Sequence, residues 1–178
     1  MNAHTALKTN DRMDLKKNKK FKKSFFIILT IFLLDRFSKI YVLNLFEENL
    51  VSNFYITSYL NLLLIWNKGI AFGLLSIEES LFYNFITFII FGIVLVIMFM
   101  IKNSKGFKFF SLLLILGGSL GNLFDRLYYK AVPDFIDFHI NEIHWFIFNV
   151  ADIFISFGII CLIFVEIFLK KKNKNEIN

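Results

Sequence analysis

The stretch from Leu81 to Ile101 contains no charged residue. A helix with about 20 apolar residues is long enough to cross the hydrocarbon core of a bilayer. Within lipid, only helices and closed barrels satisfy every backbone hydrogen bond. The stretch therefore predicts a membrane-spanning helix. The composition agrees, because 57% of the 178 residues are hydrophobic, whereas soluble domains contain roughly 45–50%.

Three other segments are apolar enough to be spans, at about 25–45, 109–127 and 148–169. The span at 25–45 carries Asp35 and Lys39, which we expect to pair because residues four apart share one face of a helix. A basic start before an apolar run also suits a cleaved signal peptide, but no small-residue cleavage site follows. We predict an all-α polytopic membrane protein, with four spans in a single domain at 24–170.

Lys and Arg are unevenly distributed along the chain. They crowd the two tails and the short loop after the second span, at 1–23, 171–178 and 102–108. The longer loops, 46–80 and 128–147, hold only Lys68 and Lys130. The positive-inside rule then makes both termini and the short loop cytoplasmic and puts the longer loops outside. This distribution explains the net charge of +6 without nucleic acid, and we expect residues 1–23 to be disordered.

Aspartates stand out in the hydrophobic sequence between Gly121 and Asp152. A carboxylate at the centre of a membrane helix costs about 3 kcal/mol on insertion scales, so such residues are usually functional. Asp134 follows the third span and Asp152 begins the fourth, so both can lie at one depth near the outer surface. Two neighbouring carboxylates share a proton, and such a pair can activate water and protonate a leaving group. The alternative is that each acid is structural or solvated.

Other polar residues near these spans have less definite roles. Asp125 and Arg126 are expected to form a salt bridge or interfacial anchor, although Arg126 could instead bind a substrate carbonyl. Asn122 and Asn149 must find hydrogen bonds at membrane depth. Asp137 has no assigned role. The residues His139, Glu142 and His144 lack the H-E-x-x-H spacing of zinc peptidases, and we expect no metal.

The residues alone leave three classes of function open. An aspartyl hydrolase needs two facing acids, whereas a small proton-coupled transporter subunit uses acids as a relay. A relay would spread its acids across the bilayer depth, but Asp125, Asp134 and Asp152 gather on one side. A non-catalytic assembly factor would need no facing pair at all.

Five sequence blocks carry a resemblance to a known family. They are LDRFSK (34–39), NKGIAFG (67–73), GGSLGNLFDRL (117–127), VPDFIDF (132–138) and FNVAD (148–152). In content, order and spacing, the chain resembles the bacterial signal peptidase II, or lipoprotein signal peptidase, family. Two departures concern the loop before Asp134: Lys130 stands where glycine is usual, and Pro133 directly precedes the aspartate.

The resemblance implies an aspartyl endopeptidase of the bacterial inner membrane that needs no cofactor. Such enzymes remove the signal peptide from diacylglyceryl-modified prolipoproteins, so the implied partners are these substrates and membrane lipids. The implied catalytic pair is Asp134 and Asp152. The implied substrate-binding or supporting residues are Asp35, Lys39, Asn67, Gly69, Asn122, Asp125, Arg126 and Asn149. The family fold adds a small outer β-cradle and an interfacial helix to the four spans, and 46–80 is long enough to supply most of both.

Overall fold

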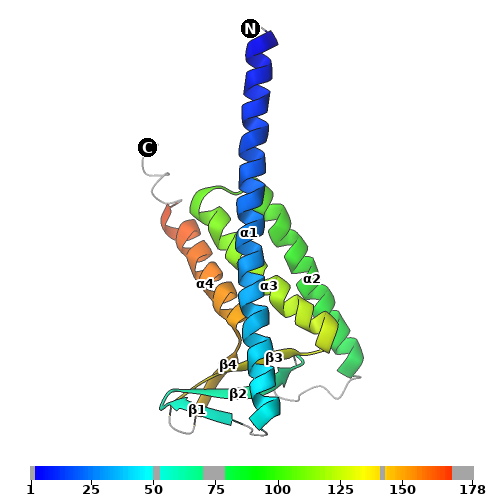
Figure 1. Ribbon diagram of the computed structural model, residues 1–178, viewed down its shortest axis with the longest axis vertical. Coiled ribbons are helices and arrows are strands. Elements are labelled where there is room, and N and C mark those ends of the chain that lie inside the picture. The colour runs from blue at the N-terminus through cyan, green and yellow to red at the C-terminus, as the bar shows by residue number, and fades with distance from the viewer. Residues whose placement is uncertain (1–2, 50–52, 70–78, 141–142, 170–178) are drawn as a thin grey trace.

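The computed structural model describes residues 3–49, 53–69, 79–140 and 143–169, and it contains a helical bundle with a small sheet at one end (Figure 1). The helices are α1 (Ala3–Asn49), α2 (Glu79–Asn103), α3 (Gly106–Tyr129) and α4 (Val150–Phe164). A π-helical segment, Val165–Leu169, continues α4. The predicted fold class, four helices of a membrane protein with a small sheet, is confirmed.

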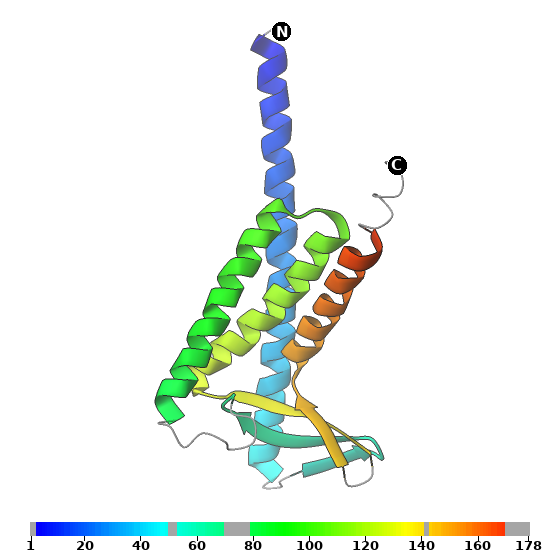
Figure 2. The ribbon, with the colours of Figure 1, turned by 180° about the vertical axis from the view of Figure 1, so that it is seen from behind.

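Among the described residues, three helical segments are long and apolar enough to cross a membrane, namely Leu81–Asn103, Gly106–Tyr129 and Val150–Phe168. They lie alongside the middle of α1 in both ribbon views (Figure 2). Large apolar side chains of α2 point away from the bundle, and Phe88 is 73% exposed. Such surfaces are unfavourable in water but match lipid tails. The predicted limits of the individual spans and tails stay predictions.

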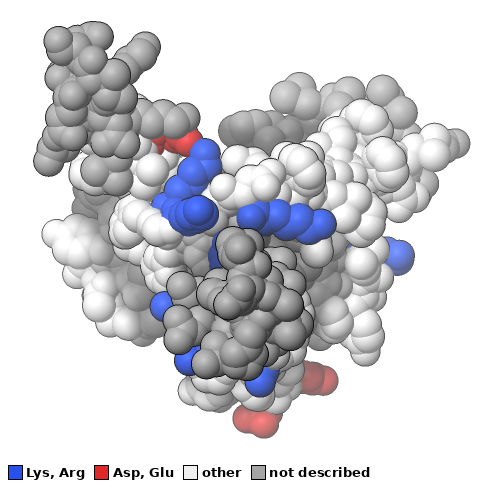
Figure 3. Space-filling view, turned by 90° about the horizontal axis from the view of Figure 1, so that it is seen from above, with Lys and Arg blue, Asp and Glu red and all other residues white. Residues whose placement is uncertain are grey.

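The N-terminal segment differs from its prediction, because residues 3–23 continue α1 as a helix. No Gly or Pro interrupts residues 3–49, and Lys is a good helix former. Lys20 joins this part of α1 to the bundle, since its Nζ donates to the Ser104 carbonyl at 3.1 Å and lies 4.3 Å from the Phe109 ring centroid. Lysines gather on this end of the molecule, opposite the sheet (Figure 3).

Helix α3 is the centre of the bundle and packs against the other three helices. Two of its glycines make close approaches. A Cβ atom on Gly118 would lie 2.5 Å from the Ala151 carbonyl oxygen of α4. One on Gly121 would lie 2.5 Å from the Asp35 carboxylate of α1. Glycine at these two positions therefore permits the close contact of α3 with α4 and α1.

The sheet has the strand order β1-β2-β3-β4, with every neighbouring pair antiparallel. Its strands are β1 (Asn53–Thr57), β2 (Leu60–Asn67), β3 (Val132–Ile140) and β4 (Ile143–Phe148). Both long loops thus contribute a hairpin, whereas we expected 46–80 to supply most of the cradle. The VPDFIDF pattern does not indicate a strand, because it contains Pro133 and because β3 has polar groups on both of its faces. The expected interfacial helix has no counterpart in the described part of 46–80, and 70–78 lie outside it.

The sheet is anchored to the end of α1 by aromatic packing. Phe135 of β3 is buried with Val42 and Phe46 of α1. The Phe46 ring meets the Phe54 ring of β1 edge to face, with centroids 5.1 Å apart. This contact fixes the start of β3 relative to the bundle, and Asp134 lies at that position.

Candidate active site

The first turn of α4 is organised by the FNVAD block. Asn149 is the N-cap, and its Oδ1 accepts a hydrogen bond from the Asp152 backbone N–H at 3.1 Å. The Asp152 carboxylate accepts in return from the Asn149 backbone N–H at 3.1 Å. This reciprocal capping box satisfies two donors that a helix start leaves free. It also fixes Asp152 at the N-terminus of α4, where the helix dipole favours a negative charge.

Asn149 connects this helix start to the strand that carries Asp134. Its side-chain Nδ2 donates to Asp134 Oδ1 at 2.6 Å. The other oxygen of Asp134 accepts from Asn67 Nδ2 at the end of β2, at 2.9 Å. One asparagine therefore binds both of the predicted catalytic acids, and its side chain is fully buried.

Asp152 is held from a second side by Asn122 of α3, whose Nδ2 donates to Asp152 Oδ1 at 2.7 Å. The Asn122 Oδ1 accepts from Lys39 Nζ at 3.0 Å. Because ammonium can only donate, Lys39 determines which end of the amide faces Asp152. Lys39 thus acts on the acid through Asn122.

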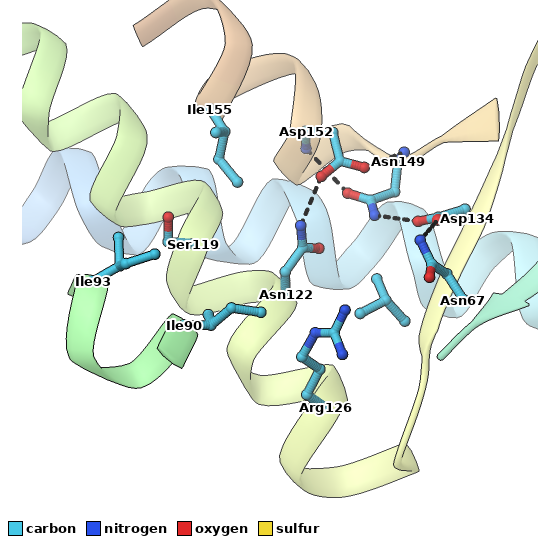
Figure 4. A pocket seen from close by; sticks show the side chains of 11 residues that line it. Asn67, Ile90, Ile93, Ser119, Asn122, Arg126, Asp134, Asn149, Asp152 and Ile155 are labelled. Carbon is cyan, nitrogen blue, oxygen red and sulfur yellow. Dashed lines mark hydrogen bonds between the residues drawn. The ribbon is translucent and has the colours of Figure 1, made fainter. Parts of the chain in front are cut away.

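Both acids border one pocket, with a cavity volume of about 240 Å³ (Figure 4). Its other polar lining residues are Ser119, Asn67, Asn122, Arg126 and Asn149. Apolar side chains complete the wall, namely Ile90 and Ile93 of α2, Val132 and Ile155. Ile90, Ile93 and Ile155 lie farther along their helices from the sheet, so the pocket reaches from the polar end toward the membrane interior.

Burial is the main reason that the pKa of Asp134 is raised, to about 6 from an ordinary 3.8. The hydrogen bonds from Asn67 and Asn149 oppose this rise, because they favour the ionised carboxylate. The negative charge of Asp152 raises the pKa of Asp134 further, whereas the positive charge of Lys39 lowers it. The electrostatic influence of Asp152 is what two acids facing one pocket should show. Asp134 therefore retains a proton nearer to neutral pH than an exposed aspartate does.

Beneath the acids lies a buried ion cluster formed by Asp35, Arg36, Lys39 and Asp125. Lys39 Nζ is 2.9 Å from the Asp35 carboxylate, so the predicted pair is confirmed, and 2.6 Å from Asp125. Arg36 reaches Asp35 at 3.0 Å and Asp125 at 2.5 Å. Asp35 also accepts from the Ala151 backbone N–H at 3.0 Å, in the first turn of α4. The cluster joins α1, α3 and α4.

The expected Asp125–Arg126 salt bridge was wrong, because Asp125 pairs with Lys39 and Arg36 of α1. Neighbouring residues of a helix point in different directions, and Arg126 faces the pocket instead. Arg36 is a supporting residue that we did not single out from sequence. Its position one residue after Asp35 in an apolar span was the available signal.

Arg126 is 7% exposed, and its Nη1 has no hydrogen-bond partner among the described residues. Gly69 makes room for it, because a Cβ there would lie 2.9 Å from Arg126 Nη2. Gly69 also has a φ of +80°, which L side chains rarely adopt, and its N–H donates to Asn67 Oδ1 at 2.6 Å. The NKG portion of the NKGIAFG block thus shapes the space around both Asp134 and Arg126.

Asp137 lies away from this constellation and is not a pocket-lining residue. Three positions after Asp134 on a strand, it belongs to the opposite face. Lys130 ends α3 with a φ of 60°, in the left-handed region. Glycine is favoured at such a helix end, which explains why glycine is the usual residue where this chain has Lys130.

Comparisons with known proteins point to one family. The family model described as signal peptidase (SPase) II matches residues 27–168. The chain belongs to the lipoprotein signal peptidase family. The lipoprotein signal peptidase of Pelagibacter ubique is 51% identical over 160 residues, which cover 90% of this chain and 96% of that protein.

Other members of the lipoprotein signal peptidase family are also similar. The protein of Burkholderia cenocepacia is 41% identical over 143 residues, covering 79% of this chain and 85% of that protein. A solved structure described as a bacterial membrane enzyme has a TM-score of 0.68 at 26% identity, covering 83% of this chain and 94% of the other. The chain is thus a multi-pass membrane protein and an aspartic-type signal peptidase that cleaves signal peptides of prolipoproteins, rather than a transporter subunit or an assembly factor.

Proposed function

We propose that Asp134 and Asp152 are the catalytic pair of this signal peptidase. The observation that carries the proposal is their shared environment: both border one pocket, and Asn149 hydrogen-bonds to each of them. A peptide hydrolase of this class needs one acid that takes a proton from water and one that gives a proton to the substrate.

The two acids differ in their surroundings. Burial raises the pKa of Asp134 to about 6, which makes it the proton donor of the pair. Asp152 accepts hydrogen bonds from Asn122 and from the Asn149 backbone, which hold its carboxylate beside the pocket. We therefore assign the general base to Asp152, which deprotonates the attacking water. Asp134 protonates the carbonyl oxygen, which gives a neutral gem-diol. As the C–N bond breaks, the proton held by Asp152 passes to the leaving amine and one diol hydroxyl returns its proton to Asp134, so that the product is a carboxylic acid and both aspartates regain their starting states.

Arg126 and the apolar wall are the substrate-binding part of the proposal. A guanidinium with a free buried N–H can donate to a peptide carbonyl near the reacting bond. Ile90, Ile93 and Ile155 offer an apolar surface deeper in the bundle, which suits the hydrophobic signal helix or the acyl chains of a diacylglyceryl-modified substrate. The supporting roles of Asp35, Lys39, Asn67, Gly69, Asn122, Asp125 and Asn149 follow from the contacts above.

The charge distribution supports a location in the bacterial inner membrane with the pocket at its outer face. Lysines of α1 and of the 102–108 loop gather at the end opposite the sheet (Figure 3). Cytoplasmic segments carry such an excess of Lys and Arg. Both termini are then cytoplasmic, and the acids meet their substrate outside.

The test is cleavage of a diacylglyceryl-modified prolipoprotein by purified variants. Asp134→Asn and Asp152→Asn should each lower kcat by at least about 10²-fold, since removing a required acid or base commonly costs 10²–10⁴. Glu48→Gln is the control, an exposed acid at the end of α1 outside the pocket, and should retain activity within a fewfold. Near-normal turnover by either of the first two variants, when correctly folded, would disprove the dyad.

A further inference from the structure

A second group of polar side chains lies on the sheet, separate from the active-site pocket. It comprises Asp137 and His139 of β3 and His144 of β4. Asp137 and His139 are two residues apart on a strand, so they belong to one face. His139 is the direct partner of His144 in the antiparallel register. The three side chains converge for this reason, although their sequence spacing matches no familiar metal motif.

The ligand atoms of this group are already close together, all within 4.8 Å of one another. His144 Nδ1 is 2.8 Å from Asp137 Oδ2, and His139 Nδ1 is 3.6 Å from the same oxygen. Donor atoms bound at about 2.0–2.2 Å in a tetrahedral zinc site are roughly 3.3–3.6 Å apart. The observed distances bracket that value, so small side-chain rotations are enough to surround an ion.

An independent observation comes from His139. Its side chain is 9% exposed, and its Nδ1 is buried with no hydrogen-bond partner among the described residues. A buried polar atom without a partner is energetically unfavourable. This nitrogen lies next to the Asp137 carboxylate, which is completely buried. The carboxylate already contacts His144 Nδ1, at 2.9 and 2.8 Å, and a cation held among the three side chains would give His139 Nδ1 a partner as well.

We propose that Asp137, His139 and His144 bind a divalent transition-metal ion of the Zn²⁺ type. Two imidazoles and one carboxylate form a donor set that zinc accepts, with water at the remaining position. Hard cations such as Mg²⁺ prefer oxygen ligands instead. His144, with a side chain 49% exposed, provides the route by which the ion enters.

The ion would link β3 to β4 rather than take part in peptide hydrolysis. None of its three ligands lines the described pocket. The two strands it joins lead from Asp134 at one side to Asn149 at the other, so the metal would stabilise the hairpin that carries the active site. An ion that binds only the folded chain raises its melting temperature.

The test uses the full chain in detergent, with a purification tag that contains no histidine, after chelation and removal of the chelator. Isothermal titration with Zn²⁺ should show one ion per chain, and Zn²⁺ should raise the melting temperature. His144→Gln should weaken binding at least about tenfold, because even loss of an outer-shell partner costs 10–100-fold. His139→Gln should do the same. His4→Gln, which changes the chain's remaining histidine, should bind like the unmodified protein.

Two results would overturn the proposal. One is the absence of saturable Zn²⁺ binding to the unmodified chain. The other is unchanged affinity in His144→Gln, which would place the ion elsewhere, such as at Asp134 and Asp152. Because His144 is half exposed, this variant should fold even if His139→Gln does not. Binding is measured without substrate, so either result leaves the peptidase function untouched.

Discussion

Replacing Lys39 with methionine tests whether the buried ion cluster holds the bundle together. The cluster contains two carboxylates and two cations, and the side chains of Asp35, Lys39 and Asp125 are completely buried. Methionine keeps the apolar stem but removes the charge, so the cluster becomes net negative. Lys39 contacts Asp125 at 2.6 Å and Asp35 at 2.9 Å. Breaking a buried ion pair by removing one partner costs about 3–5 kcal/mol.

The assay is thermal unfolding in detergent, followed by tryptophan fluorescence. A loss of 3–5 kcal/mol corresponds to roughly 6–20 °C in melting temperature for a chain of this length. The matched control is Lys108→Met, because the Lys108–Glu166 pair is also close, at 2.5 Å, but its side chains are 31% and 33% exposed. An exposed pair is worth about 0–1 kcal/mol.

The double variant Lys39→Met/Asp125→Asn separates the ion cluster from simple packing loss. It leaves Asp35 and Arg36 as a neutral pair, so we expect it to be more stable than Lys39→Met alone. Two results would contradict this explanation. One is a melting temperature for Lys39→Met that is no lower than that of Lys108→Met, and the other is a double variant whose melting temperature is no higher than that of Lys39→Met.

Two further predictions concern the strand that carries Asp134. Because burial raises the pKa of Asp134 to about 6, its proton is present below that pH and lost above it, so kcat/KM should fall as the pH rises through about 6. Among the groups that act on Asp134, Asp152 favours the protonated form, whereas Lys39, Asn67 and Asn149 favour the ionised form. Asn67→Ala should therefore move this fall toward pH 7, and an unmoved or lowered midpoint would contradict the assignment. Lys130→Gly should raise the free energy of unfolding by up to about 1 kcal/mol. A left-handed conformation costs a non-glycine residue roughly 1–2 kcal/mol, and part of this gain is offset because glycine loses more chain entropy on folding. Lys105→Gly is its control, since Lys105 has a φ of −137°, and a higher melting temperature in that variant alone would count against the explanation.

Some of this architecture could be predicted from the sequence, and the reasons are physical. Uncharged runs such as Leu81–Ile101 identify spans because the bilayer permits few alternatives. The Asp35–Lys39 pair follows from helix periodicity. FNVAD also contains an Asn and an Asp at capping-box spacing, a signal for the start of α4 that we did not use.

The remaining features depend on contacts between distant segments. Asp125 pairs with α1, and nothing local to the third span reveals that choice. The strand character of 132–140 was hidden because polar groups occupy both faces. His139 and His144 become neighbours only through the β3–β4 register, so their spacing along the chain was uninformative.

The ion cluster also sets an order for membrane insertion. Of its four members, Asp35, Arg36 and Lys39 belong to α1, which is synthesised first, while Asp125 arrives with α3. Until then two cations share the single Asp35 carboxylate, and an unpaired charge at membrane depth costs several kcal/mol. The cluster becomes electrically neutral only when α3 packs against α1. The same packing step brings Asn122 to the position where it holds Asp152.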